Sequence, residues 1–236
     1  MNRDVIIACD FSSWEQTKRF LELFTDEKPF IKIGMELFYS EGPHIIREAK
    51  AREHKIFLDL KLHDIPNTVK KAMQSLSKLD IDMCNVHAST IEMMRAAVEG
   101  LTNTDGKRPL LVAVTQLTST DERALHDELL IEKSIEETVL FYAKNAKKAG
   151  LDGTVCSPHE AAKIKQACGQ RFLTVTPGIR FEGGEKGDQK RVTTPAEAKK
   201  CGSDYIVIGR PITQAVNPVF AYRQAISDFL GGGLTE

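Results

Sequence analysis

Eight short apolar runs divide this chain of 236 residues, and longer amphipathic stretches separate them. The runs are rich in Val, Ile and Leu, and most of them do not alternate with polar residues, which is typical of strands covered on both faces. They lie at Val5–Asp10, Phe30–Gly34, Ile56–Leu60, Met83–Ala88, Leu110–Gln116, Gly153–Ser157, Phe172–Gly178 and Tyr205–Arg210. The pattern therefore predicts a parallel sheet buried between helices.

The stretches between the runs carry helix signals. Ser157 followed by Pro158 and Glu160 predicts a helix start with proline in the first position, and Gly100 and Gly150 stand where helices are expected to end. The predicted helices are Ser13–Leu23, Ile45–Glu53, Val69–Lys78, Ile91–Gly100, Ile135–Ala149 and Pro158–Ala167. Eight alternations in a chain of this length favour an α/β fold, a single-domain (β/α)8 barrel over residues 1–236. A doubly wound open sheet is the alternative, because a pattern does not show whether a sheet closes.

Composition narrows the possible partners. Lys and Arg number 32 against 33 Asp and Glu, so the net charge of −1 does not predict a nucleic-acid partner. The five cysteines are scattered without a C-x-x-C pair, which favours a reducing compartment over a disulfide framework or a zinc site. The run Val5–Cys9 is too short for a signal peptide, and no run approaches the roughly 18 apolar residues of a membrane span. We therefore expect a soluble, cytoplasmic protein in which any anionic ligand is held by a few placed cations and not by a basic face.

A charged cluster follows the third run. Asp59 and Lys61 are two residues apart, so their side chains would project from the same face of a strand. Asp64 lies three residues further along the chain, and Lys32 is near the end of the neighbouring run. In a barrel, the C-terminal ends of the strands carry the chemistry. Three interpretations remain open: a buried ion-pair network, a preorganised electrostatic site in which Lys61 is a proton donor, or a Mg²⁺ site. The Mg²⁺ site is disfavoured because the lysines between the aspartates would repel a second cation.

Two Gly-Arg signatures follow the seventh and eighth runs. Gly178 with Arg180, and Gly209 with Arg210, are the residue types that bind phosphate at this corner of a barrel. The glycine-rich segment at about 180–191 is either a surface loop or a lid that brings Gln189 to the phosphate. Elsewhere, Asp10 is a candidate for a sugar hydroxyl or a helix cap, and Thr118 for a polar ring.

Taken together, these motifs resemble those of the orotidine 5′-phosphate decarboxylases, in their bacterial form. The resemblance covers nearly the whole chain, and its Asp-x-Lys-x-x-Asp core is shared with relatives that act on sugar phosphates. It rests on Ala8-Cys9-Asp10, Lys32-Ile33-Gly34, the segment from Phe57 to Thr68, Thr176-Pro177-Gly178-Ile179-Arg180, Asp188-Gln189-Lys190-Arg191 and Ile208-Gly209-Arg210-Pro211-Ile212.

The resemblance implies a TIM-barrel homodimer that converts orotidine 5′-monophosphate to uridine 5′-monophosphate and CO₂, the last step of pyrimidine synthesis, without metal or cofactor. It makes Lys61 the proton donor to ring carbon 6, within a network of Lys32, Asp59 and Asp64. Asp64 and Thr68 would reach the neighbouring subunit's site. The substrate contacts it implies are Asp10 and Lys32 at the ribose, Thr118 at the pyrimidine, and Arg180, Gln189, Gly209 and Arg210 around the phosphate.

Two other functions remain compatible with the motifs. One is a Mg²⁺-dependent sugar-phosphate decarboxylase or aldolase on the same scaffold. The other is a nucleotide-binding barrel without catalysis.

Overall fold

The fold is a closed barrel of eight parallel strands. The structure, a computed structural model, describes residues 3–183 and 192–231. The strands follow chain order around the barrel: β1 (Asp4–Ala8), β2 (Phe30–Gly34), β3 (Ile56–Leu62), β4 (Met83–His87), β5 (Leu110–Val114), β6 (Gly153–Val155), β7 (Leu173–Thr176) and β8 (Tyr205–Ile208). The sheet closes because β1 pairs with β8, from Asp4 opposite Tyr205 to Ile7 opposite Ile208. The predicted (β/α)8 barrel is confirmed, and the open sheet is wrong.

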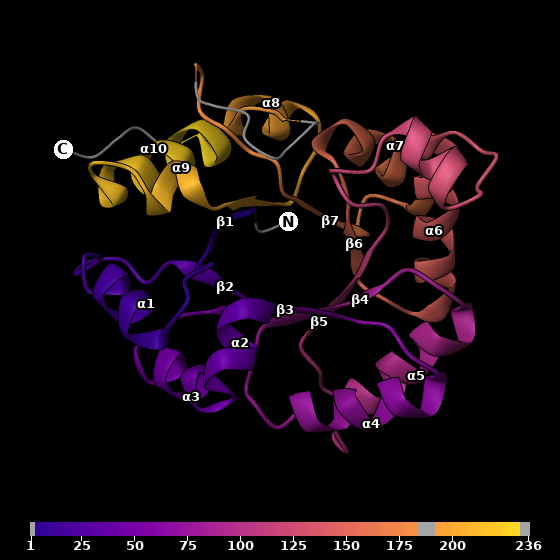
Figure 1. Ribbon diagram of the computed structural model, residues 1–236, viewed down its shortest axis with the longest axis horizontal. Coiled ribbons are helices and arrows are strands. Elements are labelled where there is room, and N and C mark those ends of the chain that lie inside the picture. The colour runs from indigo at the N-terminus through magenta and orange to yellow at the C-terminus, as the bar shows by residue number, and fades with distance from the viewer. Residues whose placement is uncertain (1–2, 184–191, 232–236) are drawn as a thin grey trace.

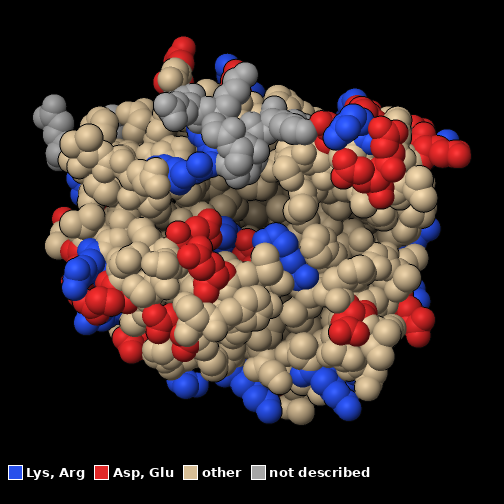
Figure 2. All heavy atoms as spheres, in the orientation of Figure 1, with Lys and Arg blue, Asp and Glu red and all other residues tan. Residues whose placement is uncertain are grey.

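Helices form a ring around the strands (Figure 1). They are α1 (Trp14–Leu21), α2 (Met35–Glu41), α3 (His44–Ala51), α4 (Pro66–Leu76), α5 (Ile91–Leu101), the π-helix η1 (Ala124–Glu128), α6 (Ile135–Ala149), α7 (Pro158–Cys168), α8 (Pro195–Lys200), α9 (Arg210–Thr213) and α10 (Pro218–Leu230). The six predicted helices are all present. Helices α2, α8 and α9 and the π-helix η1 were not predicted, because they are too short to show an apolar period. The 13-residue α10 was also missing from the predicted helices. From the same side, a space-filling view shows a hollow near the middle of the face (Figure 2).

Gly100 is the last residue but one of α5, which ends at Leu101, so the predicted helix end is right to within one residue, but the glycine also has a packing role. A Cβ atom at Gly100 would lie 2.2 Å from the carbonyl oxygen of Lys70 in α4. Glycine is therefore needed for the close approach of two helices, which a sequence pattern does not separate from a helix end. Gly150, in contrast, ends α6 with a left-handed φ of 92°.

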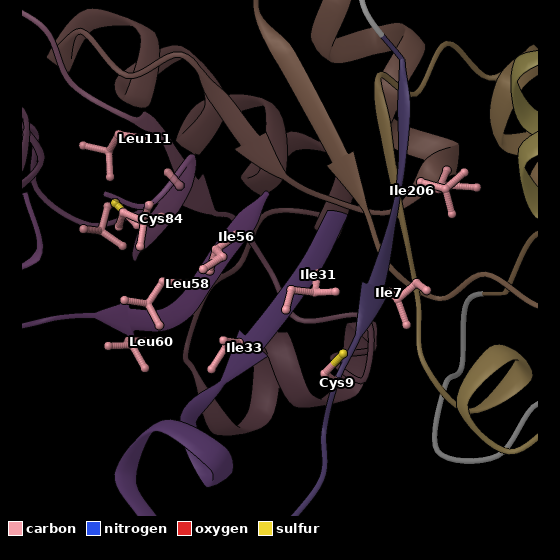
Figure 3. Packing of buried hydrophobic residues seen from close by; sticks show 14 of the residues in the cluster. Ile7, Cys9, Ile31, Ile33, Ile56, Leu58, Leu60, Cys84, Leu111 and Ile206 are labelled. Atoms are coloured by element: carbon pink, nitrogen blue, oxygen red, sulfur yellow. The ribbon is translucent and has the colours of Figure 1, made fainter. Parts of the chain in front are cut away.

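Strand residues alternate between two hydrophobic clusters. Side chains such as Ile7, Ile31 and Leu58 point outward and pack in the layer between the strands and the helices (Figure 3). A second, smaller cluster fills the barrel interior with Ile6, Ala8, Phe30, Phe57, Met83, Val112, Val175 and Val207. Because both faces of the strands are apolar, the strands read as continuous apolar runs in the sequence.

A polar layer lies above the interior cluster. The next inward-facing residues on β2, β3 and β4 are Lys32, Asp59 and Asn85, which are 8%, 7% and 1% exposed. Burial of charged groups is costly unless they are paired and hydrogen-bonded. The barrel therefore carries a compact layer of charged groups, Lys32 and Asp59, directly above its apolar interior cluster. This layer is called the charged floor below.

Acidic residues connect neighbouring strands through hydrogen bonds at the N-terminal end of the barrel. An aspartate stands immediately before each of β4, β6 and β8, and its carboxylate accepts a hydrogen bond from a backbone N–H near the start of the preceding strand. The pairs are Asp82 with Ile56 (2.8 Å), Asp152 with Leu111 (2.7 Å) and Asp204 with Thr174 (2.8 Å). Each carboxylate also pairs with a cation, which is Lys50, Arg108 and Lys165 respectively. This end of the barrel thus carries charges that serve stability.

We predict that Lys165→Met lowers the free energy of unfolding by about 3 kcal/mol, because it leaves the buried carboxylate of Asp204 without its ammonium partner. The control is Lys163→Met on the same helix, whose pair with Glu136 is half exposed and contributes at most about 1 kcal/mol. Urea denaturation of both variants measures the difference. Equal losses in the two variants would contradict the prediction.

Candidate active site

The C-terminal ends of the strands open into two adjoining pockets. The first is lined by Lys32, Asp59, Lys61 and Thr118, together with apolar residues of β3, β5, β6 and β8. The second is lined by Asp10, Lys32, Arg180, Gly209, Arg210 and Gln214. Lys32, Pro177 and Val207 line both, so the pockets form one continuous site. Acidic and basic atoms lie around the hollow in Figure 2.

Asp59 is the centre of the first pocket. Its Oδ1 accepts hydrogen bonds from Lys61 Nζ at 2.7 Å and from Asn85 Nδ2 at 2.6 Å. Its Oδ2 lies 3.2 Å from Lys32 Nζ, which also donates to Asp10 Oδ1 at 2.8 Å. The charges alternate along a chain from Lys61 through Asp59 and Lys32 to Asp10. The structure therefore brings these four predicted residues together, and Asp10 faces the site instead of capping α1, whose N-cap is Ser13.

The environment keeps these groups ionised. Burial by itself raises the pKa of Asp59, but Lys32 and Lys61 outweigh it, so the pKa lies below its ordinary value. Burial also lowers the pKa of Lys32, but the carboxylates of Asp59 and Asp10 outweigh that effect and raise the pKa overall. The pocket therefore holds the ionised pair of Asp59 and Lys32, and Lys61 Nζ lies 2.7 Å from the same carboxylate.

Lys61 reaches Asp59 through an irregular backbone. Its φ is +52°, a left-handed conformation that costs a non-glycine residue roughly 1–3 kcal/mol. The register also shifts here, because β3 advances from Leu58 to Leu62 while β4 advances only from Cys84 to Val86. The sequence had suggested a regular strand with Asp59 and Lys61 on one face. The two side chains do meet, but the bulge at Lys61 sets how they meet.

Two residues of the site were not predicted. Asn85 accepts a hydrogen bond from the backbone N–H of Lys61 at 2.8 Å while its amide donates to Asp59. A single amide between apolar neighbours on a buried strand was the available signal. Gly34 provides space, because a Cβ atom there would lie 3.0 Å from Asp10 Oδ1 and 3.2 Å from Lys32 Nζ.

The second pocket has the features of an anion site. Arg180 and Arg210 both line this pocket. Burial lowers the pKa of Arg180, and the charge of Arg210 lowers it further. Gly178 adopts a φ of +82°, which favours glycine, and Gly209 precedes the short helix α9. A phosphate would relieve the repulsion between the two arginines. Gln189 and most of the predicted lid lie outside the described residues.

Asp64 and Thr68 lie away from both pockets. The two residues are exposed, and Asp64 Oδ1 accepts a hydrogen bond from the N–H of Ile65 at 2.6 Å, just before α4. Among the residues the structure describes, Asp64 makes no ion pair with Lys61. Within one chain, the expected charged network therefore stops at Lys61.

The donor set does not favour the Mg²⁺ interpretation of the motif. Within residues 3–183 and 192–231, no group of three or more His, Cys, Asp or Glu side chains is placed to hold a metal ion. Both oxygens of Asp59 already face ammonium groups, and a divalent cation would lie beside Lys32 and Lys61. The geometry instead favours the electrostatic interpretation.

Comparison with known families matches residues 3–225, nearly the whole chain, to one family. The chain belongs to the orotidine 5′-phosphate decarboxylase / HUMPS family. Two relatives, each named orotidine 5′-phosphate decarboxylase, are 55% identical over 235 residues in a Geobacillus species and 58% identical over 219 residues in Streptococcus thermophilus. The first alignment covers 98% of both chains, and the second covers 92% of this chain and 93% of its relative.

A solved structure of orotidine 5′-phosphate decarboxylase from Lactobacillus acidophilus is also similar, with a TM-score of 0.86 and 42% identity. The similarity covers 97% of this chain and 99% of that one. Membership of the orotidine 5′-phosphate decarboxylase / HUMPS family confirms the resemblance that the motifs indicate.

We predict that the contribution of Asp59 to stability is lost in acid. Because its pKa in the folded protein is lowered, the ionised form is favoured by folding, and its contribution is full above the unfolded value of about 4. The contribution declines as the pH falls through the lowered pKa. Urea denaturation of wild type and Asp59→Asn at several pH values should show a gap in unfolding free energy that is constant near neutrality and shrinks below about pH 4. A gap that widens in acid would contradict the prediction.

Proposed function

We propose that this chain converts orotidine 5′-monophosphate to uridine 5′-monophosphate and CO₂, the final step of pyrimidine synthesis, and that it does so without metal or cofactor. The observation that carries the proposal is a fixed ammonium, Lys61, held 2.7 Å from Asp59 in a pocket that adjoins an arginine-rich anion pocket. Membership of the decarboxylase family and the names of its close relatives support the reaction.

The two pockets suit the two ends of this substrate. The pyrimidine would occupy the first pocket, where Thr118 supplies polar contact among apolar walls. The phosphate would occupy the second, against Arg180, Gly209 and Arg210. The ribose would lie between them, beside Asp10 and Lys32. Lys32 therefore serves both the charged floor and the sugar.

Lys61 would carry the chemical step. Loss of CO₂ leaves an electron pair on carbon 6, in the plane of the ring, where the π system does not stabilise it. A preorganised ammonium beside that carbon stabilises the developing charge and then donates its proton. Asp59 lies 2.7 Å from the Lys61 ammonium and orients it, and the charge of Asp59 would repel the substrate carboxylate until CO₂ leaves.

The phosphate would supply binding energy far from the bond that breaks. We propose that this energy closes the segment at about 180–191 over the ligand, with Gln189 reaching the phosphate. Closure would exclude water from the carbanion. A substrate that lacks the phosphate should therefore lose reaction rate as well as affinity.

We further propose a homodimer with shared active sites. Asp64 and Thr68 are exposed at the start of α4, and between them Ile65 exposes 67% of its surface. An exposed apolar side chain beside a functional motif is a feature of a contact surface. Asp64 of one subunit would complete the charged network of its neighbour, which ends at Lys61 within one chain.

The cytoplasm is the compartment that we propose. All five cysteines are free, and Cys9, Cys84, Cys156 and Cys168 are buried as thiols. Burial raises the pKa of Cys84 to about 12, so that thiol stays protonated and inert. None of the helices described is both long and apolar enough to cross a membrane.

The function is tested by following turnover of orotidine 5′-monophosphate in excess EDTA through its ultraviolet absorbance. We expect full activity in the chelator, and a loss of kcat of at least about 10³-fold in Lys61→Ala with retained affinity for uridine 5′-monophosphate. Lys78→Ala, an exposed lysine on the surface, is the control.

Each alternative function has its own outcome in this assay. A chain that is inactive on this substrate but turns over a ketose phosphate with Mg²⁺ would be a sugar-phosphate enzyme. A chain that binds the nucleotide without turnover would be a binding protein only.

Shared active sites predict complementation between inactive variants. We expect Lys61→Ala and Asp64→Ala to be nearly inactive alone and to regain up to roughly a quarter of wild-type activity when mixed, because some mixed dimers contain one intact site. Subunit exchange is verified by native mass spectrometry of differently tagged chains. If exchange occurs and no activity returns, each site is self-contained.

A further inference from the structure

Asn85 is the buried polar residue of the site to which neither the motifs nor the proposed reaction gives a role. It lies on β4 and is 1% exposed, with Cys84 and Val86 as its fully buried neighbours in the chain. A buried amide is retained only where its hydrogen bonds are satisfied. Its side chain makes hydrogen bonds to Asp59 and to the backbone of Lys61, both on β3.

The side chain of Asn85 joins two different parts of β3. Its Nδ2 donates to Asp59 Oδ1 at 2.6 Å, and its Oδ1 accepts from the backbone N–H of Lys61 at 2.8 Å. The bond to Lys61 lies at the point where the register of β3 and β4 shifts. A carboxamide suits this place because it offers a donor and an acceptor on one rigid group.

These contacts act on the residue that the proposed chemistry requires. Lys61 has a left-handed φ of +52°, a conformation that persists only where surrounding contacts hold it. Asp59 Oδ1 is shared by Lys61 Nζ and Asn85 Nδ2, so the amide fixes the carboxylate oxygen to which the ammonium points. The side chain of Asn85 thus holds both the backbone of Lys61 and the carboxylate of Asp59 with which the Lys61 ammonium pairs.

We propose that Asn85 is a positioning residue for decarboxylation, which holds Lys61 in its bulged conformation and aims its ammonium by clamping Asp59. The inference rests on the proposed function for the reaction, but the clamp is a property of the chain. It acts through Lys61 and Asp59 and makes no contact with the reacting atoms. Its loss should therefore lower kcat and leave nucleotide binding, which depends on the arginine pocket, largely unchanged.

The test compares kcat on orotidine 5′-monophosphate with the Kd of uridine 5′-monophosphate in a graded series. Asn85→Leu keeps the size but removes both hydrogen bonds, and we expect kcat to fall about 100-fold while Kd changes less than about threefold. Asn85→Ser retains one hydrogen bond at most, and we expect a loss of roughly 10-fold. The matched control is Val112→Ala, the residue opposite Asn85 on β5 and equally buried, for which we expect a kcat near that of wild type.

Asn85→Asp provides a readout that a merely structural role would not move. The introduced carboxylate would face Asp59 and Lys61 of β3, with Lys32 of β2 and His87 of β4 close by. As the pH falls, the pair formed by Asp59 and the introduced carboxylate takes up a proton. The protonated oxygen at position 85 can then donate a hydrogen bond to Asp59, as the amide does in wild type. We expect the activity relative to wild type to increase at least about fivefold between pH 8 and pH 5.5. A uniform loss at all pH values would overturn the proposal.

The outcomes separate this inference from the proposed function. If wild type does not decarboxylate the substrate, the proposed function fails. If wild type is active, Lys61→Ala is inactive, and Asn85→Leu keeps its kcat within about twofold, only the role of Asn85 fails. Should Asn85→Leu not fold, Asn85→Ser decides, since wild-type kcat in that variant overturns the clamp.

Discussion

The buried carboxylate of Asp59 is the group around which the site is organised. Desolvation alone would favour its neutral form, yet its pKa is lowered because Lys32 and Lys61 approach it and Asn85 donates a further hydrogen bond. Each of these partners comes from a strand, β2, β3 or β4, so their geometry is set by the sheet and not by mobile loops. Even the strained backbone of Lys61 is understandable in these terms, because the contacts of the carboxylate and of Asn85 offset its local cost.

In the proposed reaction, the two pockets divide binding from chemistry. The arginine pocket, with Arg180 and Arg210, offers charge at a place where no bond needs to change, whereas the Lys61 pocket offers charge at the proposed reacting carbon. Lys32 lines both and links them electrostatically, because it pairs with Asp59 on one side and with Asp10 on the other. The proposed reaction uses no electron-accepting cofactor and would therefore depend on such fixed charges. A site that holds its charges rigid before the substrate arrives needs little reorganisation during the step.

The two ends of the barrel use charge for different purposes. At the N-terminal end, aspartates such as Asp82, Asp152 and Asp204 accept hydrogen bonds from backbone N–H groups of neighbouring strands and pair with cations. These charged groups therefore hold the strands together. At the C-terminal end, charged groups such as Lys32, Asp59 and Lys61 pair with one another and line pockets that a ligand can enter. The same residue types therefore support stability at one end and function at the other, and only their position in the fold separates the two.

The sequence by itself determined the strand and helix alternation, the positions of most strands, and the predicted site residues near strand ends. These features can be predicted from the sequence because burial of both strand faces and helix capping depend on a few neighbouring residues. Only the tertiary structure decided that the sheet closes, that Gly100 serves helix packing, that Lys61 sits in a bulge, and that Asn85 joins it to Asp59. Each of these depends on contacts between residues far apart in the chain, which no local pattern encodes. The physical reason is that register and closure are properties of paired strands, whereas periodicity is a property of one.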